Sequence, residues 1–192
     1  MDRRIIKTRQ EIRTAYFQLI RMKKDGKITI TELTKAAKID RKTFYLYYDR
    51  VDDIMDDFCK ELVQEVLEQL ADVKFLVGTF EIHFLFEVLY NILKKNIDYH
   101  QLLPENYSNL FWERLQRMLV QFLTDTYADS VTVSGDIMRI YSEFYLSGMI
   151  RLYQKHFNDP QTMTYEQMEQ IYLDIVLHGA SRILKKSDQG RE

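Results

Sequence analysis

The chain of 192 residues contains few of the residues that mark several common protein classes. Its single cysteine, Cys59, excludes an intrachain disulfide and fits a reducing compartment. Two prolines and six glycines are too few for a turn-rich β fold. No stretch approaches the ~18 apolar residues of a membrane span, and the charged start is unlike a signal peptide. We therefore expect a cytoplasmic protein without a membrane partner.

Sequence signatures of catalysis and metal binding are also missing. The chain has no glycine-rich phosphate loop, no two-histidine zinc motif and no serine-nucleophile motif. His83 and Glu87 share a helical face and could supply two metal ligands, but an ordinary helix-stabilising pair is the commoner arrangement. The sequence therefore predicts no enzyme, no cofactor and no metal site.

Helical periodicity is the dominant pattern. Ile54, Phe58, Leu62, Val66 and Leu70 recur every fourth residue and predict a helix over 52–76. Similar spacing predicts helices over 79–95, 106–127, 137–156 and 165–184, with loops at 96–105 and 128–135. The predicted fold class is all-α.

Charge divides the chain into two parts. Residues 1–50 hold 14 lysines and arginines against 6 aspartates and glutamates, whereas the other 142 residues hold 13 against 23. A basic amino-terminal quarter on an acidic body indicates a polyanionic partner that contacts one end only.

Two capped helices lie in the basic quarter. Thr29 and Glu32 have capping-box spacing and open a short helix. After a tight turn, Asp40 can cap a second helix over 39–51. Phe44 and Tyr48, four residues apart, give the second helix one apolar edge for docking. With a longer helix upstream, this spacing is typical of a helix-turn-helix domain whose second helix reads DNA.

The other side of this second helix carries cations and phenols. We expect Arg41 and Lys42 to contact base edges, with guanine acceptors as the best match. Tyr45, Tyr47 and Thr29 would bind phosphate, and Thr31 could reach either. A solvated basic face is the alternative, which the helix-turn-helix spacing and the charge asymmetry disfavour. The full set of predicted DNA contacts is Thr29, Thr31, Arg41, Lys42, Thr43, Tyr45, Tyr47 and Arg50.

These residues carry a family resemblance. The stretches 27–33 (KITITEL), 36–39 (AAKI) and 43–48 (TFYLYY) resemble the amino-terminal domain of TetR/AcrR-type transcriptional regulators. Two departures concern Gly26, two positions beyond the usual glycine, and Val51, where a phosphate-binding lysine is common. Arg50 is the nearest substitute for that lysine. The resemblance implies a helix-turn-helix domain over 1–50 and a helical effector-binding and dimerisation domain over 51–192.

The resemblance also implies a pocket for a small organic effector in the carboxy-terminal domain. Aromatic and methionine side chains between helices can line such a pocket, although each one alone is more often plain core. The candidate lining residues are Phe58, Leu62, Phe86, Tyr90, Trp112, Tyr141 and Tyr145.

The helices predicted over 137–156 and 165–184 are apolar over more than a third of their girth. Such helices bury two sides, and a second copy of the chain is the economical cover for the side that does not face the core. The alternative is that both helices are deeply buried in a monomer. The candidate interface residues are Leu146, Ile150, Tyr153, Ile171, Ile175 and Gly179.

Together these patterns predict a homodimeric transcriptional regulator that binds a pseudo-palindromic, double-stranded DNA operator. A repressor released by a small organic effector is the leading hypothesis. An activator or co-activator controlled by a protein partner remains an alternative. From a different class, a helical enzyme with no recognisable site also remains open.

Overall fold

The computed structural model describes residues 3–23, 27–70, 79–127 and 133–179, with only the backbone of 79–81 and 127. Within these ranges every regular element is a helix, which confirms the all-α class. No helix there is both long and apolar enough to cross a membrane. The helices are α1 (Arg3–Lys23), α2 (Ile30–Ala36), α3 (Arg41–Tyr45), α4 (Asp53–Leu70), α5 (Thr79–Lys95), α6 (Ile97–His100), α7 (Glu105–Tyr127), α8 (Gly135–Asn158) and α9 (Tyr165–His178).

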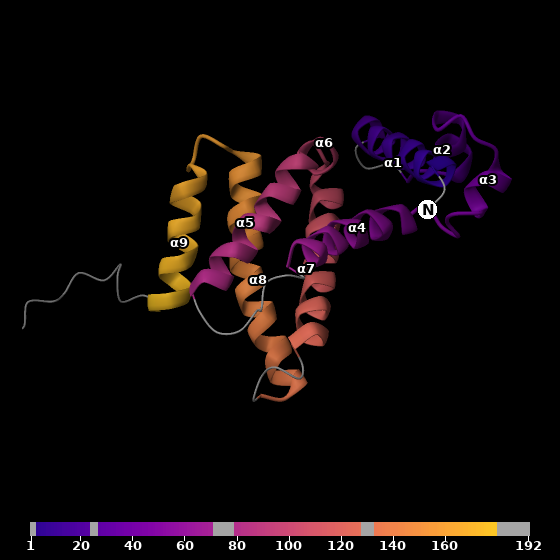
Figure 1. Ribbon diagram of the computed structural model, residues 1–192. Coiled ribbons are helices and arrows are strands. Elements are labelled where there is room, and N and C mark those ends of the chain that lie inside the picture. Colours follow the sequence, from indigo (N-terminus) through magenta and orange to yellow (C-terminus); the bar gives the residue numbers. More distant parts are fainter. Residues whose placement is uncertain (1–2, 24–26, 71–78, 128–132, 180–192) are drawn as a thin grey trace, which may run out of the picture.

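Figure 1 shows how these helices are arranged. Helices α1 to α3 gather at one end of the molecule, and α9 lies at the opposite end of the body. Helix α4 runs from the first group into the body, where it packs on α7 and α5. A single helix therefore belongs to both parts of the fold.

Local chemistry explains where the short helices begin. At the start of α2, the Thr29 backbone N–H donates to Glu32 Oε2 at 2.9 Å, and the Glu32 N–H donates to Thr29 Oγ1 at 3.3 Å. These two bonds complete the predicted capping box. Asp40 caps α3 by accepting the Thr43 N–H at 2.6 Å. Between the two helices, Lys38 takes the left-handed conformation (φ 55°) that lets the chain turn sharply.

The second helix of the predicted helix-turn-helix is shorter than predicted. The sequence predicts a helix over 39–51, but α3 ends at Tyr45 and the chain leaves the helix before α4 begins. The Arg50 backbone N–H donates to Asp53 Oδ2 at 2.7 Å, so this carboxylate holds the segment that enters α4. The sequence pattern did not show this, because the carboxylate of Asp53 lies outside the stretch 39–51 that was predicted as one helix.

The remaining boundaries agree to within a few residues wherever the structure describes them. Helix α8 extends two residues beyond the predicted 137–156 at each end, and the predicted loop at 96–105 contains the short α6. The predicted end of the helix over 52–76 lies outside the described residues, as does Gly26. Helix α9 ends at His178, before the predicted end at 184, and Gly179 caps it with a φ of 58°.

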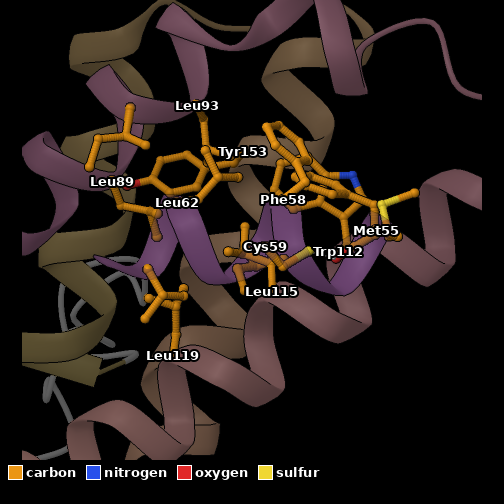
Figure 2. Close-up of a cluster of buried hydrophobic side chains, with 14 of the residues drawn as sticks. Met55, Phe58, Cys59, Leu62, Leu89, Leu93, Trp112, Leu115, Leu119 and Tyr153 are labelled. Carbon is orange, nitrogen blue, oxygen red and sulfur yellow. Dashed lines mark hydrogen bonds between the residues drawn. The ribbon is translucent and has the colours of Figure 1, made fainter. Parts of the chain in front are cut away.

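The core of the body forms around one face of α4. Figure 2 shows Met55, Phe58 and Leu62 of this helix against Trp112 and other side chains of α7, with further partners from α5 and α8. All of them are buried, so their apolar surface is removed from water on folding. The labelled partners are Leu89, Leu93, Trp112, Leu115, Leu119 and Tyr153.

An aromatic cluster connects this core to the amino-terminal helices. The ring of Phe17 in α1 lies 5.2 Å from that of Phe58 in α4 and 5.2 Å from that of Tyr99 in α6. Phe58 and Tyr99 are also 5.2 Å apart, in an edge-on arrangement that aromatic pairs favour. Helix α1 is therefore anchored on the body as well as on α2.

The predicted pocket residues do not form one lining. Phe58, Leu62, Phe86, Tyr90 and Trp112 are buried. The side chains of Tyr141 and Tyr145, however, are 51% and 37% exposed on the outer side of α8, so their placement in the interior is wrong. Helix α8 is apolar over more than a third of its girth, and its pattern alone did not reveal which part of that apolar surface faces the body.

The orientation of α8 about its axis also decides the predicted dimer interface, and three of its six residues lie on the side that faces the core. Leu146, Ile150 and Tyr153 are almost fully buried within the chain, and the Tyr153 hydroxyl donates to the carbonyl oxygen of Phe86. They belong to the core, so their assignment to an interface is wrong. Ile171 and Ile175 of α9 are exposed, as is Gly179, which ends that helix with a positive φ. Their role in an interface stays a prediction.

Candidate nucleic-acid interface

Helix α3 separates its residues cleanly into an inner and an outer side. Phe44 and Tyr48 are buried, so the predicted docking edge faces the amino-terminal core. Arg41, Lys42 and Tyr45 are exposed on the other side. A rigid helix that presents two cations and a phenol to solvent has the chemistry needed to approach a DNA groove.

A direct bond joins the start of α2 to α3. The Arg41 Nη2 donates to Thr31 Oγ1 at 2.5 Å, across ten residues of sequence. Two of the predicted contact residues are therefore brought together at the surface. The bond also restricts the guanidinium before any ligand arrives, which lowers the entropy cost of using it.

Thr29 is already committed to its own helix cap. Its hydroxyl donates to Glu32 Oε2 at 2.8 Å, and Lys23 Nζ lies 2.7 Å from Glu32 Oε1. The Lys23 ammonium, followed by the Thr29 backbone and hydroxyl donors, lowers the pKa of Glu32 to about 2. A phosphate would have to compete with this carboxylate for the Thr29 hydroxyl proton.

The other predicted contacts differ in accessibility. Thr43 and Tyr47 are half-buried, and the Thr43 N–H is used by Asp40. That bond, first among several, lowers the pKa of Asp40. Arg50 is exposed, but its Nη2 lies 3.4 Å from Asp52 Oδ2, so part of its charge is compensated. Arg41, Lys42 and Tyr45 are therefore the most available members of the predicted set.

Asp57 of α4 holds Tyr48, in the segment that follows α3. The Tyr48 hydroxyl donates to Asp57 Oδ2 at 2.7 Å, and Arg9 of α1 donates to Oδ1. Arg13 of α1 lies 4.0 Å from the same carboxylate and pairs with Glu61. Burial, and then the bond to Asp57, raises the pKa of Tyr48. Helices α1 and α4 and the segment that follows α3 thus meet at one carboxylate, which sequence periodicity did not reveal.

A second ion pair ties the start of α4 to the body. Arg114 of α7 lies 3.0 Å from Asp56 Oδ1 and donates to the carbonyl oxygen of Asp52 at 2.9 Å. The Arg114 side chain is mostly buried, so this contact is less screened by solvent than a surface pair. The helix next to α3 is therefore held from the body side as well.

One exposed residue of the reader surface escaped the sequence prediction. Leu46 directly follows α3 and its side chain is 72% exposed. The sequence did contain a signal, because Leu46 lies four residues after Lys42 and so shares its helical face.

We expect replacement of Asp57 by alanine to lower the free energy of unfolding by about 3 kcal/mol, because it leaves Arg9 and Arg13 poorly compensated in a largely buried place. Tyr48→Phe should cost about 1 kcal/mol, the value of one hydrogen bond. Urea denaturation measures both. The surface pair Lys7–Glu11 is the control, since Lys7→Ala should change stability by less than about 1 kcal/mol. Equal effects of Asp57→Ala and Lys7→Ala would contradict the anchoring role.

Comparisons with known proteins agree with this geometry. No protein-family model matches the chain. A stretch of 72 residues, 37% of this chain, is 28% identical to the HTH-type transcriptional regulator YxbF of Bacillus subtilis, but spans only 19% of that protein. The crystal structure of a protein of Syntrophomonas wolfei, assigned to the TetR family of transcriptional regulators, aligns with a TM-score of 0.63. The alignment covers 88% of this chain and 92% of that one, at 14% identity. The chain therefore has the fold of this TetR-family structure.

Proposed function

We propose that the chain is a transcriptional regulator that binds DNA in a sequence-specific manner, as a dimer on a pseudo-palindromic operator. The observation that carries the proposal is the outer side of α3, where Arg41, Lys42 and Tyr45 are exposed on a helix docked through Phe44. The two similar proteins support it, because both are described as transcriptional regulators. The basic charge of residues 1–50 supplies the attraction to phosphate.

Reading and positioning fall to different side chains in this proposal. Arg41 and Lys42 occupy the first turn of α3, the end that enters the major groove in helix-turn-helix proteins. Their donors match the O6 and N7 acceptors of guanine. Tyr45 lies one turn further on and offers a hydroxyl to the phosphate backbone, which fixes the register without reading sequence.

An exposed apolar face supports the dimer. Ile140, Tyr141 and Phe144 lie on the outer side of α8, and Ile171 and Ile175 lie on α9. Exposed apolar groups are costly in water unless a partner covers them, and isologous pairing covers the same face on two copies. The proposed interface therefore uses the side of α8 opposite to the one that the sequence suggested. Its exposed apolar members are Ile137, Ile140, Tyr141, Phe144, Tyr145, Ile171 and Ile175.

The proposal also includes a small organic effector. In it the protein is a repressor that leaves its operator when the effector binds. A ligand among the buried aromatic side chains of the body would act on DNA binding through α4, because this helix contacts α7 and, through the bond between Asp57 and Tyr48, the segment that follows α3. Such a ligand works only if it binds one arrangement of α4 more tightly than the other.

For DNA binding, we expect Lys42→Ala to cost about 1–3 kcal/mol of operator affinity and to relax the base preference, because a base contact is lost. Tyr45→Phe should weaken all sequences alike, since a phosphate bond carries no sequence information. Binding should also fall steeply with salt. Titration of duplexes selected from a random pool, at two salt concentrations, measures all three effects.

The control for the reader variants is Lys155→Ala, which removes an exposed charge from α8 in the body. It should leave operator affinity unchanged. If Lys42→Ala and Tyr45→Ala both behave like this control, α3 is not the reader and the proposed function is wrong.

For the dimer, sedimentation at micromolar concentration should give twice the chain mass of 23.2 kDa. Phe144→Asp should yield monomers, because two charges would face each other across a two-fold interface from which water is excluded. Leu102→Asp is the matched control, since Leu102 is equally exposed (68% for each residue) but lies outside the face. A monomeric wild type, or a dimer that tolerates Phe144→Asp, would refute the proposed interface.

For the effector, Trp112 is a built-in reporter, since it is the only tryptophan and lies buried beside His100 and Phe111. Hydrophobic and cationic aromatic compounds that bind in the body should change its emission and also lower operator affinity. In Trp112→Phe the emission signal should vanish while release from DNA persists. A library in which no compound produces both effects would count against effector control.

A further inference from the structure

Leu46 is an exposed leucine at the tip of a basic surface. Its side chain is 72% exposed, while its neighbours in sequence, Phe44 and Tyr48, are buried. Exposed leucines are common on proteins, but this one lies beside Tyr45 and one turn from Lys42, both exposed and both proposed to contact DNA. A molecule that contacts Lys42 and Tyr45 would therefore also lie close to Leu46.

The backbone determines the direction of this side chain. Leu46 has right-handed helical dihedrals (φ −72°, ψ −19°), and its N–H bonds to the carbonyl oxygen of Lys42 at 3.2 Å. Leu46 is therefore the next helical position above Lys42, on the same face. Side chains on a helix lean toward its amino terminus, so Leu46 leans toward the end of α3 that carries Arg41 and Lys42.

We propose that Leu46 reads a thymine by packing against its C5-methyl group in the major groove. The base edges in that groove carry hydrogen-bond donors and acceptors, and the thymine methyl is the apolar group that distinguishes one base. Leucine has no donor or acceptor, so it gains nothing from a polar edge or a phosphate oxygen. The inference rests on the proposed function, because it requires α3 to enter the groove.

In this proposal Lys42 and Leu46, neighbours on one helical face, contact different bases. Lys42 reads an acceptor-rich edge, and Leu46 reads a methyl group one helical turn, about 5.4 Å, along the axis. Base pairs stack about 3.4 Å apart, so the two residues fall on neighbouring or next-neighbouring base pairs. A thymine is therefore expected one or two base pairs from the position that Lys42 reads.

The test removes one methyl group at a time from the DNA. An operator is first selected from random duplexes with the full-length wild-type protein. Each thymine of the half-sites is then replaced by deoxyuridine, which lacks only the C5-methyl group, and affinities are measured by titration. At one thymine position the wild type should lose about fourfold in affinity per half-site, the equivalent of one buried methyl group.

Three variants show whether Leu46 is responsible. Leu46→Ala should bind the thymine and deoxyuridine operators equally at that position, and Leu46→Met should keep most of the difference. Leu102→Ala, an exposed leucine of the body, should behave as the wild type. Thermal melting of each variant checks the fold, which these exposed substitutions should leave unchanged.

The outcomes separate the two claims. If the wild type selects no sequence, the proposed function fails and this inference fails with it. If it selects an operator but no thymine shows a methyl effect that Leu46→Ala abolishes, only the thymine contact is refuted. A loss of affinity in Leu46→Ala that is equal on every duplex would assign Leu46 to the DNA backbone and would also refute the proposal.

Discussion

The carboxylate of Asp57 is the point on which the arrangement of the amino-terminal helices depends. It accepts a hydrogen bond from the hydroxyl of Tyr48, three residues beyond the end of α3, and pairs with Arg9 of α1. Phe44 and Tyr48 also bury their rings against the same core. Helix α3 has only five residues, too few to be stable alone, so these tertiary contacts rather than helix propensity hold it in place. The exposed side of α3 is consequently as rigid as its attachment to α4.

Helix α4 carries this attachment on a structure that also belongs to the body. Phe58, one residue after Asp57, stacks on Phe111 of α7 and meets Phe17 of α1 edge-on. Two consecutive residues of α4 therefore make these contacts. Asp57 binds the amino-terminal helices through its carboxylate, and Phe58 packs on both α1 and α7. Because packed side chains do not deform continuously, a shift of α4 against α7 would disturb the contacts of α4 with Phe17 of α1 and with Tyr48.

Sequence reasoning succeeded where the cause of structure is local. The capping box at Thr29 and the cap at Asp40 need only neighbouring residues, and both helix starts were predicted. It failed where the cause is distant. Carboxylates of α4 hold the segment where α3 ends. The side of α8 that faces the core is the one whose Tyr153 hydroxyl donates to the Phe86 carbonyl oxygen of α5. Helix α8 is apolar over a broad arc, so its sequence pattern does not show which part of that arc faces the core.

The surfaces that remain apolar after folding carry information that the buried core does not. The core would need the same kinds of side chain in any all-helical protein, whatever its function. Exposed Phe144 and Ile140 on α8, and exposed Leu46 beside Lys42, each leave apolar area in water, where it contributes nothing to the stability of the single chain. Such residues gain stabilisation only when a partner excludes water from them. The two proposed sites differ in chemistry, because one face is broad and apolar while the other is a single leucine among cations and phenols. A second copy of the chain suits the first, and a methyl group set among hydrogen-bonding groups suits the second.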